Sequence, residues 1–354
     1  MKPKTFIAFA GLTLAALAAA VLAVHGRDAA SPVDAAAGQP LIAGLAARIN
    51  QVTVLTLAAG SQSVTLARSD PESQAWSIVE KSGHPADAGL VRRAIVALAG
   101  ARTLEPRTGN PDQYPKLALD DATATSLTLR GADGAELPGL ILGKTVSAAT
   151  PDHPGSFYAR RAAETRAWLA EGRLPPLSAD PLQWLPRDLP AMPRGRVASV
   201  KVAGGSGGEI VIGRKDPAAA DFTLTAPTRP GKPKQGKIND LAGAAEFLAC
   251  EDVVPAAAAG AATVTATVTA FKSFEGEILS IRVSRHDGPS WANISAALEG
   301  AAKSPEAEQR VKEIQDRYAP WSYRLSDAAA ADLAPSADEL VEAVKAEDGV
   351  PKRK

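Results

Sequence analysis

The sequence contains few of the residues from which catalytic and metal sites are usually built. It has one cysteine, Cys250, and four histidines in 354 residues. A single cysteine excludes both an intramolecular disulfide and a thiolate cluster for a metal ion. Because Cys250 ends the apolar run at 247–250, we expect a buried thiol rather than a reactive one. Aromatic residues amount to only 5% of the chain, so most of them are needed for hydrophobic cores.

The chain also lacks an excess of charge of either sign. Lysine plus arginine and aspartate plus glutamate both number 39, which argues against the basic surface of a nucleic-acid-binding protein. The short basic tail at 348–354 is expected to be solvated rather than bound to anionic lipid. A composition of 45% apolar and 22% charged residues is ordinary for globular proteins, and the length suffices for two domains.

Only one long hydrophobic run is present, from Thr5 to Val24. As a helix it would span about 30 Å, the thickness of a bilayer core. Lys2 and Lys4 precede the run, which places the N-terminus inside and the rest of the chain outside. The run is longer than the roughly 7–15 residues of a signal-peptide core and lacks a clear cleavage site. Residues 1–27 therefore predict a retained transmembrane anchor, with a cleaved signal peptide as the alternative.

The rest of the chain carries the same pattern twice. A segment reading apolar, any, apolar, small, Arg, any, Asp, Pro occurs at Val64 to Pro71 and again, 146 positions later, at Ile210 to Pro217. Three further pairs of segments correspond at similar offsets: Trp76 to Ile78 with Phe222 to Leu224, Arg48 to Val52 with Arg196 to Val200 at 148, and Ser178 to Leu182 with Ser336 to Leu340 at 158. We therefore predict a flexible tether at 28–44, followed by two tandem, homologous domains at 45–190 and 191–347.

Each domain is expected to be α+β, a β-rich meander with one amphipathic helix. In the first, runs rich in Val, Thr, Leu and Ile predict strands at 52–57, 63–68, 75–80, 124–130, 137–142 and 157–161, with a hairpin turn at 132–134. A helical stripe runs from Leu90 to Leu98, and Arg92 and Arg93 point away from it. The same order in the second domain predicts strands at 197–203, 209–213, 221–226, 263–271 and 277–284 and a helix at 238–250.

The second copy is 12 residues longer, and much of the gain is expected at Pro305 to Tyr318. Ser304 and Pro305 suit the cap and first turn of a helix. Ala307 and Val311 begin an apolar stripe on an otherwise charged sequence. We expect this helix to pack on its own domain, and it is also the best local candidate for a contact surface.

Two glycine-containing motifs resemble functional loops but occur in the wrong context. Gly204 to Gly208 matches the nucleophile elbow, which needs a strand-to-helix turn, whereas strands are predicted on both sides of Ser206. Gly143-Lys144-Thr145 resembles the end of a phosphate-binding loop, but the first glycine of that motif is misplaced. We interpret both as structural, and no catalytic, cofactor-binding or metal-binding residue is assigned.

The histidines give no clear metal site. His25, His84, His153 and His286 are scattered, and no pair has the spacing of ligands on a helix. Asp152-His153 and His286-Asp287 stand in turns rich in Pro or Gly, which favours turn chemistry. The remaining alternative is that His153 and His286 meet where the two domains face each other.

Several segments resemble a bacterial family known only as domain of unknown function 4340. The similar residues are Trp76 to Ile78, Gly83 to Asp87, Tyr114 with Leu117 and Leu119, Leu142-Gly143, Phe157 to Arg160 and Pro181 to Leu185. Ala118 and Ala122 stand where the family commonly has Gly and Pro, so the loop there is expected to differ. The resemblance implies one N-terminal membrane span and a gene neighbourhood with ABC-type exporter components and a partner of gliding-motility type. It supplies no catalytic residues.

Two functions are compatible with these features. The leading hypothesis is a non-catalytic accessory or scaffold protein, anchored by a single pass in the bacterial inner membrane with its soluble body in the periplasm. Its expected partners are membrane subunits of an ABC-type export or envelope complex, and no cofactor or nucleic acid is expected. The alternative is a periplasmic ligand-binding protein or hydrolase with a site in the cleft between the two repeats.

Overall fold

The computed structural model describes residues 37–204, 208–228, 230–258, 266–285, 288–300 and 304–342. The chain divides between Trp184 and Leu185 into two compact units, called unit 1 and unit 2 below. The predicted anchor, the Gly-rich loop with Ser206, His25, His286 and the basic tail lie outside the described residues. Among the residues that are described, no helix is long and apolar enough to cross a membrane.

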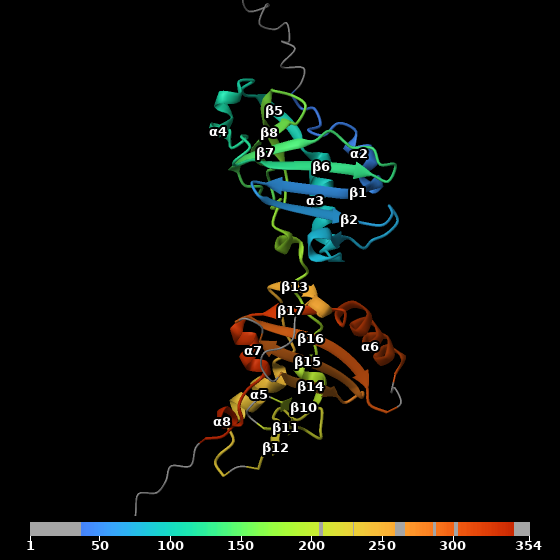
Figure 1. The fold of residues 1–354 in the computed structure, drawn as a ribbon, viewed down its shortest axis with the longest axis vertical. Coiled ribbons are helices and arrows are strands. Elements are labelled where there is room, and N and C mark those ends of the chain that lie inside the picture. The colour runs from blue at the N-terminus through green and yellow to red at the C-terminus, as the bar shows by residue number, and fades with distance from the viewer. Residues whose placement is uncertain are drawn as a thin grey trace, which may run out of the picture. The chain divides into compact units, whose positions relative to one another are not determined.

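Unit 1 is one antiparallel sheet with short helices (Figure 1). The helices are α2 (Leu45–Arg48), α3 (Ala88–Gly100) and α4 (Tyr114–Leu117). The sheet has the order β4-β3-β2-β1-β6-β7-β8-β9-β5. Its strands are β1 (Val52–Ala59), β2 (Gln62–Ala67), β3 (Ser77–Ile78), β4 (His84–Pro85), β5 (Arg102–Pro106), β6 (Thr125–Gly131), β7 (Leu140–Ser147), β8 (Gly155–Arg161) and β9 (Ala167–Gly172).

Unit 2 is a second antiparallel sheet, of order β12-β11-β10-β14-β15-β16-β17-β13. Its strands are β10 (Val197–Gly204), β11 (Ile210–Gly213), β12 (Thr223–Ala226), β13 (Asp252–Pro255), β14 (Thr267–Ser273), β15 (Glu277–Arg285), β16 (Ser290–Leu298) and β17 (Trp321–Leu325). Its helices are α5 (Gln235–Gly243), α6 (Pro305–Tyr318), α7 (Asp327–Leu333) and α8 (Ala337–Leu340). The expected β-rich α+β class is confirmed.

The two sheets have the same strand order once β4 is set aside. In each unit a meander is followed by a helix, and the strand after that helix pairs beside the last strand of the sheet. Figure 1 shows α3 passing behind β6, β1 and β2, where it buries Val91, Ile95 and Leu98. In unit 2, α5 contacts β10, α7 and α8. The helix therefore covers the sheet that the meander builds.

The register corrects one part of the sequence alignment. Leu55 pairs with Leu66, and Val200 pairs with Ile212. Because Leu66 and Ile212 correspond at the offset of 146, Leu55 and Val200 correspond at 145. The predicted match of Val52 to Val200 at an offset of 148 is therefore wrong. This shift could not be detected from the sequence, because apolar residues alternate along both strands and several alignments fit the pattern.

The predicted helix at 238–250 is also wrong in its second half. α5 ends at Gly243, and Leu189 and Cys250 then form backbone hydrogen bonds with Leu248 and Arg187, so that residues 248–250 are extended. Unit 1 has the same arrangement at its own start, where Gly38 to Leu41 bond to Ala101 and Thr103. Each unit thus begins earlier than the predicted boundaries at 45 and 191.

One arginine has the same surroundings in both units, and it is the arginine of the repeated pattern. The Arg68 guanidinium donates to the carbonyls of Val52, Asn50, Pro71 and Ser73 at 2.7–3.1 Å. The Arg214 guanidinium donates to the carbonyls of Val197, Arg194, Gly195 and Ala219 at 2.6–3.0 Å.

Each of these guanidiniums also lies over an aromatic ring. Arg68 stacks on Trp76 at 5.1 Å and Arg214 on Phe222 at 4.7 Å. The first strand of each sheet has an irregularity at this place, between Val52 and Val54 in β1 and between Val197 and Ser199 in β10. A bulge takes backbone groups out of the ladder, and a guanidinium with five donors can satisfy several of them. The recurring Arg therefore holds the bulge, the turn and the aromatic ring together.

We predict that Arg68→Met lowers the free energy of unfolding by about 1–3 kcal/mol, because four carbonyls, one of them in the buried residue Val52, lose a charged donor while the apolar stem is retained. Urea unfolding followed by tryptophan fluorescence measures this. Arg214→Met should have a similar effect. The exposed Arg166 gives a matched control, Arg166→Met, with a change below about 0.5 kcal/mol. Equal effects of the Arg68 and Arg166 variants would contradict this role.

Candidate functional site

The outward face of α3 carries two arginines and an exposed valine. Asp87 caps the helix, because its Oδ1 accepts a hydrogen bond from the Leu90 N–H at 2.8 Å. The apolar stripe turns inward as predicted, and this leaves Arg92, Arg93 and Val96 on the solvent side. Val96 is 50% exposed and is the apolar residue of this outward face.

These side chains form one wall of a groove of about 830 Å³. The chain leaves α3 directly into β5, whose first residue Arg102 pairs with Glu171 of β9. Residues 172–175 then follow along the same groove. We call this surface the arginine groove; its charged and central residues are Arg92, Arg93, Val96, Arg102, Glu171 and Arg173. Four cations thus face a single carboxylate.

The arginines of the groove are held in different ways. Arg92 donates to the side chain of Gln74, and Arg173 donates to the carbonyls of Thr150 and Pro151. Both contacts are to neutral acceptors, so they leave the positive charge uncompensated. Over the described ranges, none of the four guanidiniums forms an ion pair, and Arg93 and Arg102 form no side-chain hydrogen bond.

Unit 2 does not repeat the groove at the equivalent positions. The backbone N–H of Asp87 before α3 bonds to the Trp184 carbonyl, and that of Lys234 before α5 bonds to the Leu340 carbonyl. This equivalence gives an offset of 147 over the helix, which places Asn239, Asp240 and Ala249 where unit 1 has its arginines at 92, 93 and 102. The shared fold therefore does not require the arginines.

A second cavity, of about 510 Å³, adjoins the groove in unit 1. Gly172, Leu174 and Pro175 line both. The pairing of β7 with β8 shifts register twice beside this cavity, where Ser147 Oγ and Ser156 Oγ lie 2.7 Å apart. In unit 2 the equivalent strands β15 and β16 pair without a shift. Both hollows of unit 1 thus occur where the two units differ.

The motif at 143–145 lies inside strand β7. A side chain at Gly143 would place its Cβ 2.3 Å from the Leu117 carbonyl oxygen, which explains the glycine by close packing. Lys144 lies 6.0 Å from the ring of Tyr158. These residues therefore belong to the sheet and to its contact with α4.

The histidines within the described residues are in structural positions. His84 is buried in β4, with its Nδ1 2.8 Å from the Pro85 carbonyl oxygen. His153 is exposed beside Asp152, and its backbone N–H donates to Thr150 Oγ1 at 3.2 Å, as in a turn. Over the described ranges, no group of three or more His, Cys, Asp or Glu side chains is placed to hold a metal ion.

The predicted helix at 305–318 is present as α6, and Ser304 Oγ caps it by accepting from the Ala307 N–H. α6 packs on β16 with Ala307 and Val311 buried, so it covers its own unit as expected. Gln315 Nε2 donates to the Ala296 carbonyl at 2.7 Å and fixes the last turns.

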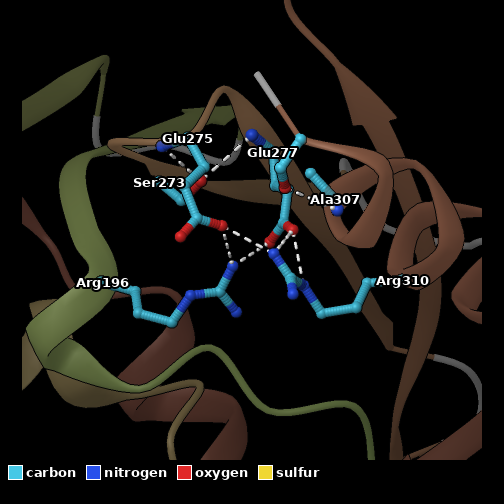
Figure 2. A network of polar contacts seen from close by, with 7 residues as sticks. Arg196, Ser273, Glu275, Glu277, Ala307 and Arg310 are labelled. Atoms are coloured by element: carbon cyan, nitrogen blue, oxygen red, sulfur yellow. Dashed lines mark hydrogen bonds and ion pairs between the residues drawn. The ribbon is translucent and has the colours of Figure 1, made fainter. Parts of the chain in front are cut away.

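A network of two arginines and two glutamates fastens α6 to the sheet (Figure 2). Glu277 is 5% exposed and accepts from Arg196 at 2.5 Å and from Arg310 Nε at 2.6 Å. Glu275 accepts from both arginines as well, at 2.8 and 2.6 Å. The hydrogen bond from Arg310 to Glu277 is the main cause that raises the pKa of Arg310. Sequence reasoning missed this network, because its members are distant in the chain.

We predict that Glu277→Gln loosens α6 without unfolding the sheet, because the two guanidiniums lose the buried carboxylate between them and keep only that of the more exposed Glu275. Amide hydrogen exchange across 305–318 should speed up by at least about tenfold, which corresponds to about 1.4 kcal/mol. Asp316→Asn on the same helix loses only an exposed pair with Lys312 and should leave exchange nearly unchanged. Unaltered protection in the Glu277 variant would count against the network.

Cys250 is buried, at 3% exposure, and burial raises the pKa of its thiol to about 11. Only the thiolate reacts with alkylating agents, so we predict very slow labelling by iodoacetamide at pH 8 in the folded chain. Labelling should accelerate in urea, where the pKa returns to about 8.5. Mass spectrometry at timed intervals measures both rates. Fast labelling without urea would show that the thiol is accessible.

The comparisons with known proteins match the region that contains the groove. The family model described as "Domain of unknown function (DUF4340)" matches residues 76–267, more than half of the chain, including α3, β5 and β9. Searches of curated proteins and of solved structures found no match. By this match the chain belongs to the family described as domain of unknown function DUF4340.

Proposed function

We propose that this protein is a membrane-tethered accessory subunit that binds another protein through unit 1. The observation that carries the proposal is the arginine groove, where four guanidiniums and an exposed valine line one concave surface. Arginine is enriched at protein interfaces, and the core of such an interface is more apolar than the rest of the surface. The fold does not need these side chains, since unit 2 has the same strand order without them.

The proposed setting follows from the sequence. The run from Thr5 to Val24 would be a single-pass anchor in the bacterial inner membrane, and the two units would stand in the periplasm. Subunits of an ABC-type export or envelope complex are the proposed partners. The shared strand order and the paired Arg68 and Arg214 support an origin of the two units by duplication, which would make the body a two-lobed scaffold.

A second candidate function is the binding of a small ligand in the cavity beside β7 and β8. A volume of about 510 Å³ is in the range of ligand sites, and two register shifts between β7 and β8 lie beside it, whereas β15 and β16 pair without a shift. Thr125, Thr145 and Ser147 offer hydroxyl groups, and Leu142 and Phe157 offer apolar surface. This would be a site within one unit.

We predict that chemical cross-linking in intact cells captures the full chain together with one or more membrane subunits of fixed stoichiometry. The adducts should appear in the membrane fraction and disappear when the run from Thr5 to Val24 is replaced by a cleavable secretion signal, because the partner would no longer be held close. Gel electrophoresis with mass spectrometry identifies them. Recovery of the monomer alone, under conditions that cross-link a known membrane complex in the same cells, would refute the proposal.

A further inference from the structure

The cations of the arginine groove are all arginines, and they come from three separate places in unit 1. Arg92 and Arg93 lie on α3, Arg102 begins β5 and Arg173 follows β9. A guanidinium binds a carboxylate or phosphate through two parallel hydrogen bonds, whereas the lysine ammonium acts as a point charge. With one carboxylate, Glu171, against four guanidiniums, the groove is complementary to an anionic group.

The groove also offers apolar surface between its charges. Val96 lies one helical turn beyond Arg92 and Arg93, and Leu174 and Pro175 face it from the segment after β9. A purely charged ligand would leave this surface in contact with water. An apolar side chain would cover it, at a gain of roughly 25 cal/mol per Å² of apolar area.

We infer that the groove binds an extended acidic segment of a partner protein, in which an apolar side chain is flanked by aspartate or glutamate. The apolar side chain covers Val96, and the carboxylates accept hydrogen bonds from the guanidiniums of Arg93 and Arg102, which form no side-chain hydrogen bond or ion pair in the described ranges. This inference rests on the proposed function and names the partner's chemistry.

A protein segment fits this surface better than a lipid surface does. Attraction to anionic lipid depends on the number of positive charges near a broad surface, and lysine serves it as well as arginine. Here the cations are arginines only, and the walls are set by Pro154 and Pro175 around a concave space. Interfaces between proteins, in contrast, are enriched in arginine and depleted in lysine.

The test places a photo-cross-linking amino acid at Val96 of the full chain in intact cells. Val79 is the matched site, because it is also a valine of unit 1 and is 52% exposed against 50% for Val96, but it lies outside the groove. We expect adducts from position 96 whose cross-linked peptide contains an apolar residue between acidic residues. Position 79 should give no adduct with that peptide.

The charge reversal Arg93→Glu with Arg102→Glu should reduce the adduct at position 96 at least about tenfold, because two charge-assisted contacts become repulsive. The control Arg166→Glu with Lys116→Glu makes the same change in net charge on exposed side chains of unit 1 that do not line the groove, and the adduct should stay within about twofold. Changing two acidic residues of the captured peptide to arginine should restore the adduct with the reversed groove.

The outcomes separate the two proposals. Three results at position 96 would overturn the acidic-segment inference: adducts with lipid, adducts with a peptide that lacks carboxylates, or an adduct yield that does not change on charge reversal. Protein adducts from Val79 or from the exposed Val146 but none from Val96 would overturn it as well and leave the accessory function standing. Absence of protein adducts at all three sites would count against the accessory function itself.

Discussion

Each unit depends on one guanidinium that satisfies several backbone carbonyls at once. Arg68 and Arg214 join the irregular start of the first strand to the turn after the second strand, and each carries an aromatic ring on its face. Desolvation lowers the pKa of Arg68, yet the group stays charged because its usual pKa is so high. Without this side chain the carbonyls of the buried residues Val52 and Val197 would lose a charged donor, and the bulge would lose its connection to the turn.

Because that constraint is local to the repeated pattern, the rest of each unit is free to differ. Unit 2 contains α6 between β16 and β17, where it is fastened by Glu277 and Arg310 and covers its own sheet. Unit 1 has only a short connection between β8 and β9, and Gly172 of β9 lines both the arginine groove and the cavity beside β7 and β8. The same fold thus supports an additional packed helix in one unit and a charged groove in the other.

The fold was predictable where local chemistry decides it. The Arg-x-Asp-Pro pattern, the stripe of α3 and the cap of α6 each occupy a few neighbouring residues. Strands β4, β5, β9, β13, β16 and β17 were not predicted. β9 and β16 contain several Ala residues, which have weak strand preference, and β4, β5 and β13 are short and end in Pro, so these segments become strands only by pairing with neighbours.

The arginine groove could not be predicted from the sequence for a related reason, because it also depends on which strands pair. Arg92 and Arg93 could be placed on the solvent side of a helix, but such residues usually only solvate a surface. Arg102 and Arg173 join them through the pairing of β5 with β9, which brings positions 102 and 171 together. A sequence can indicate which side chains a helix leaves outside. The sheet topology decides which strands lie beside those side chains. In this chain the pairing of β5 with β9 brings together residues that are ordinary when considered singly, and so forms the groove.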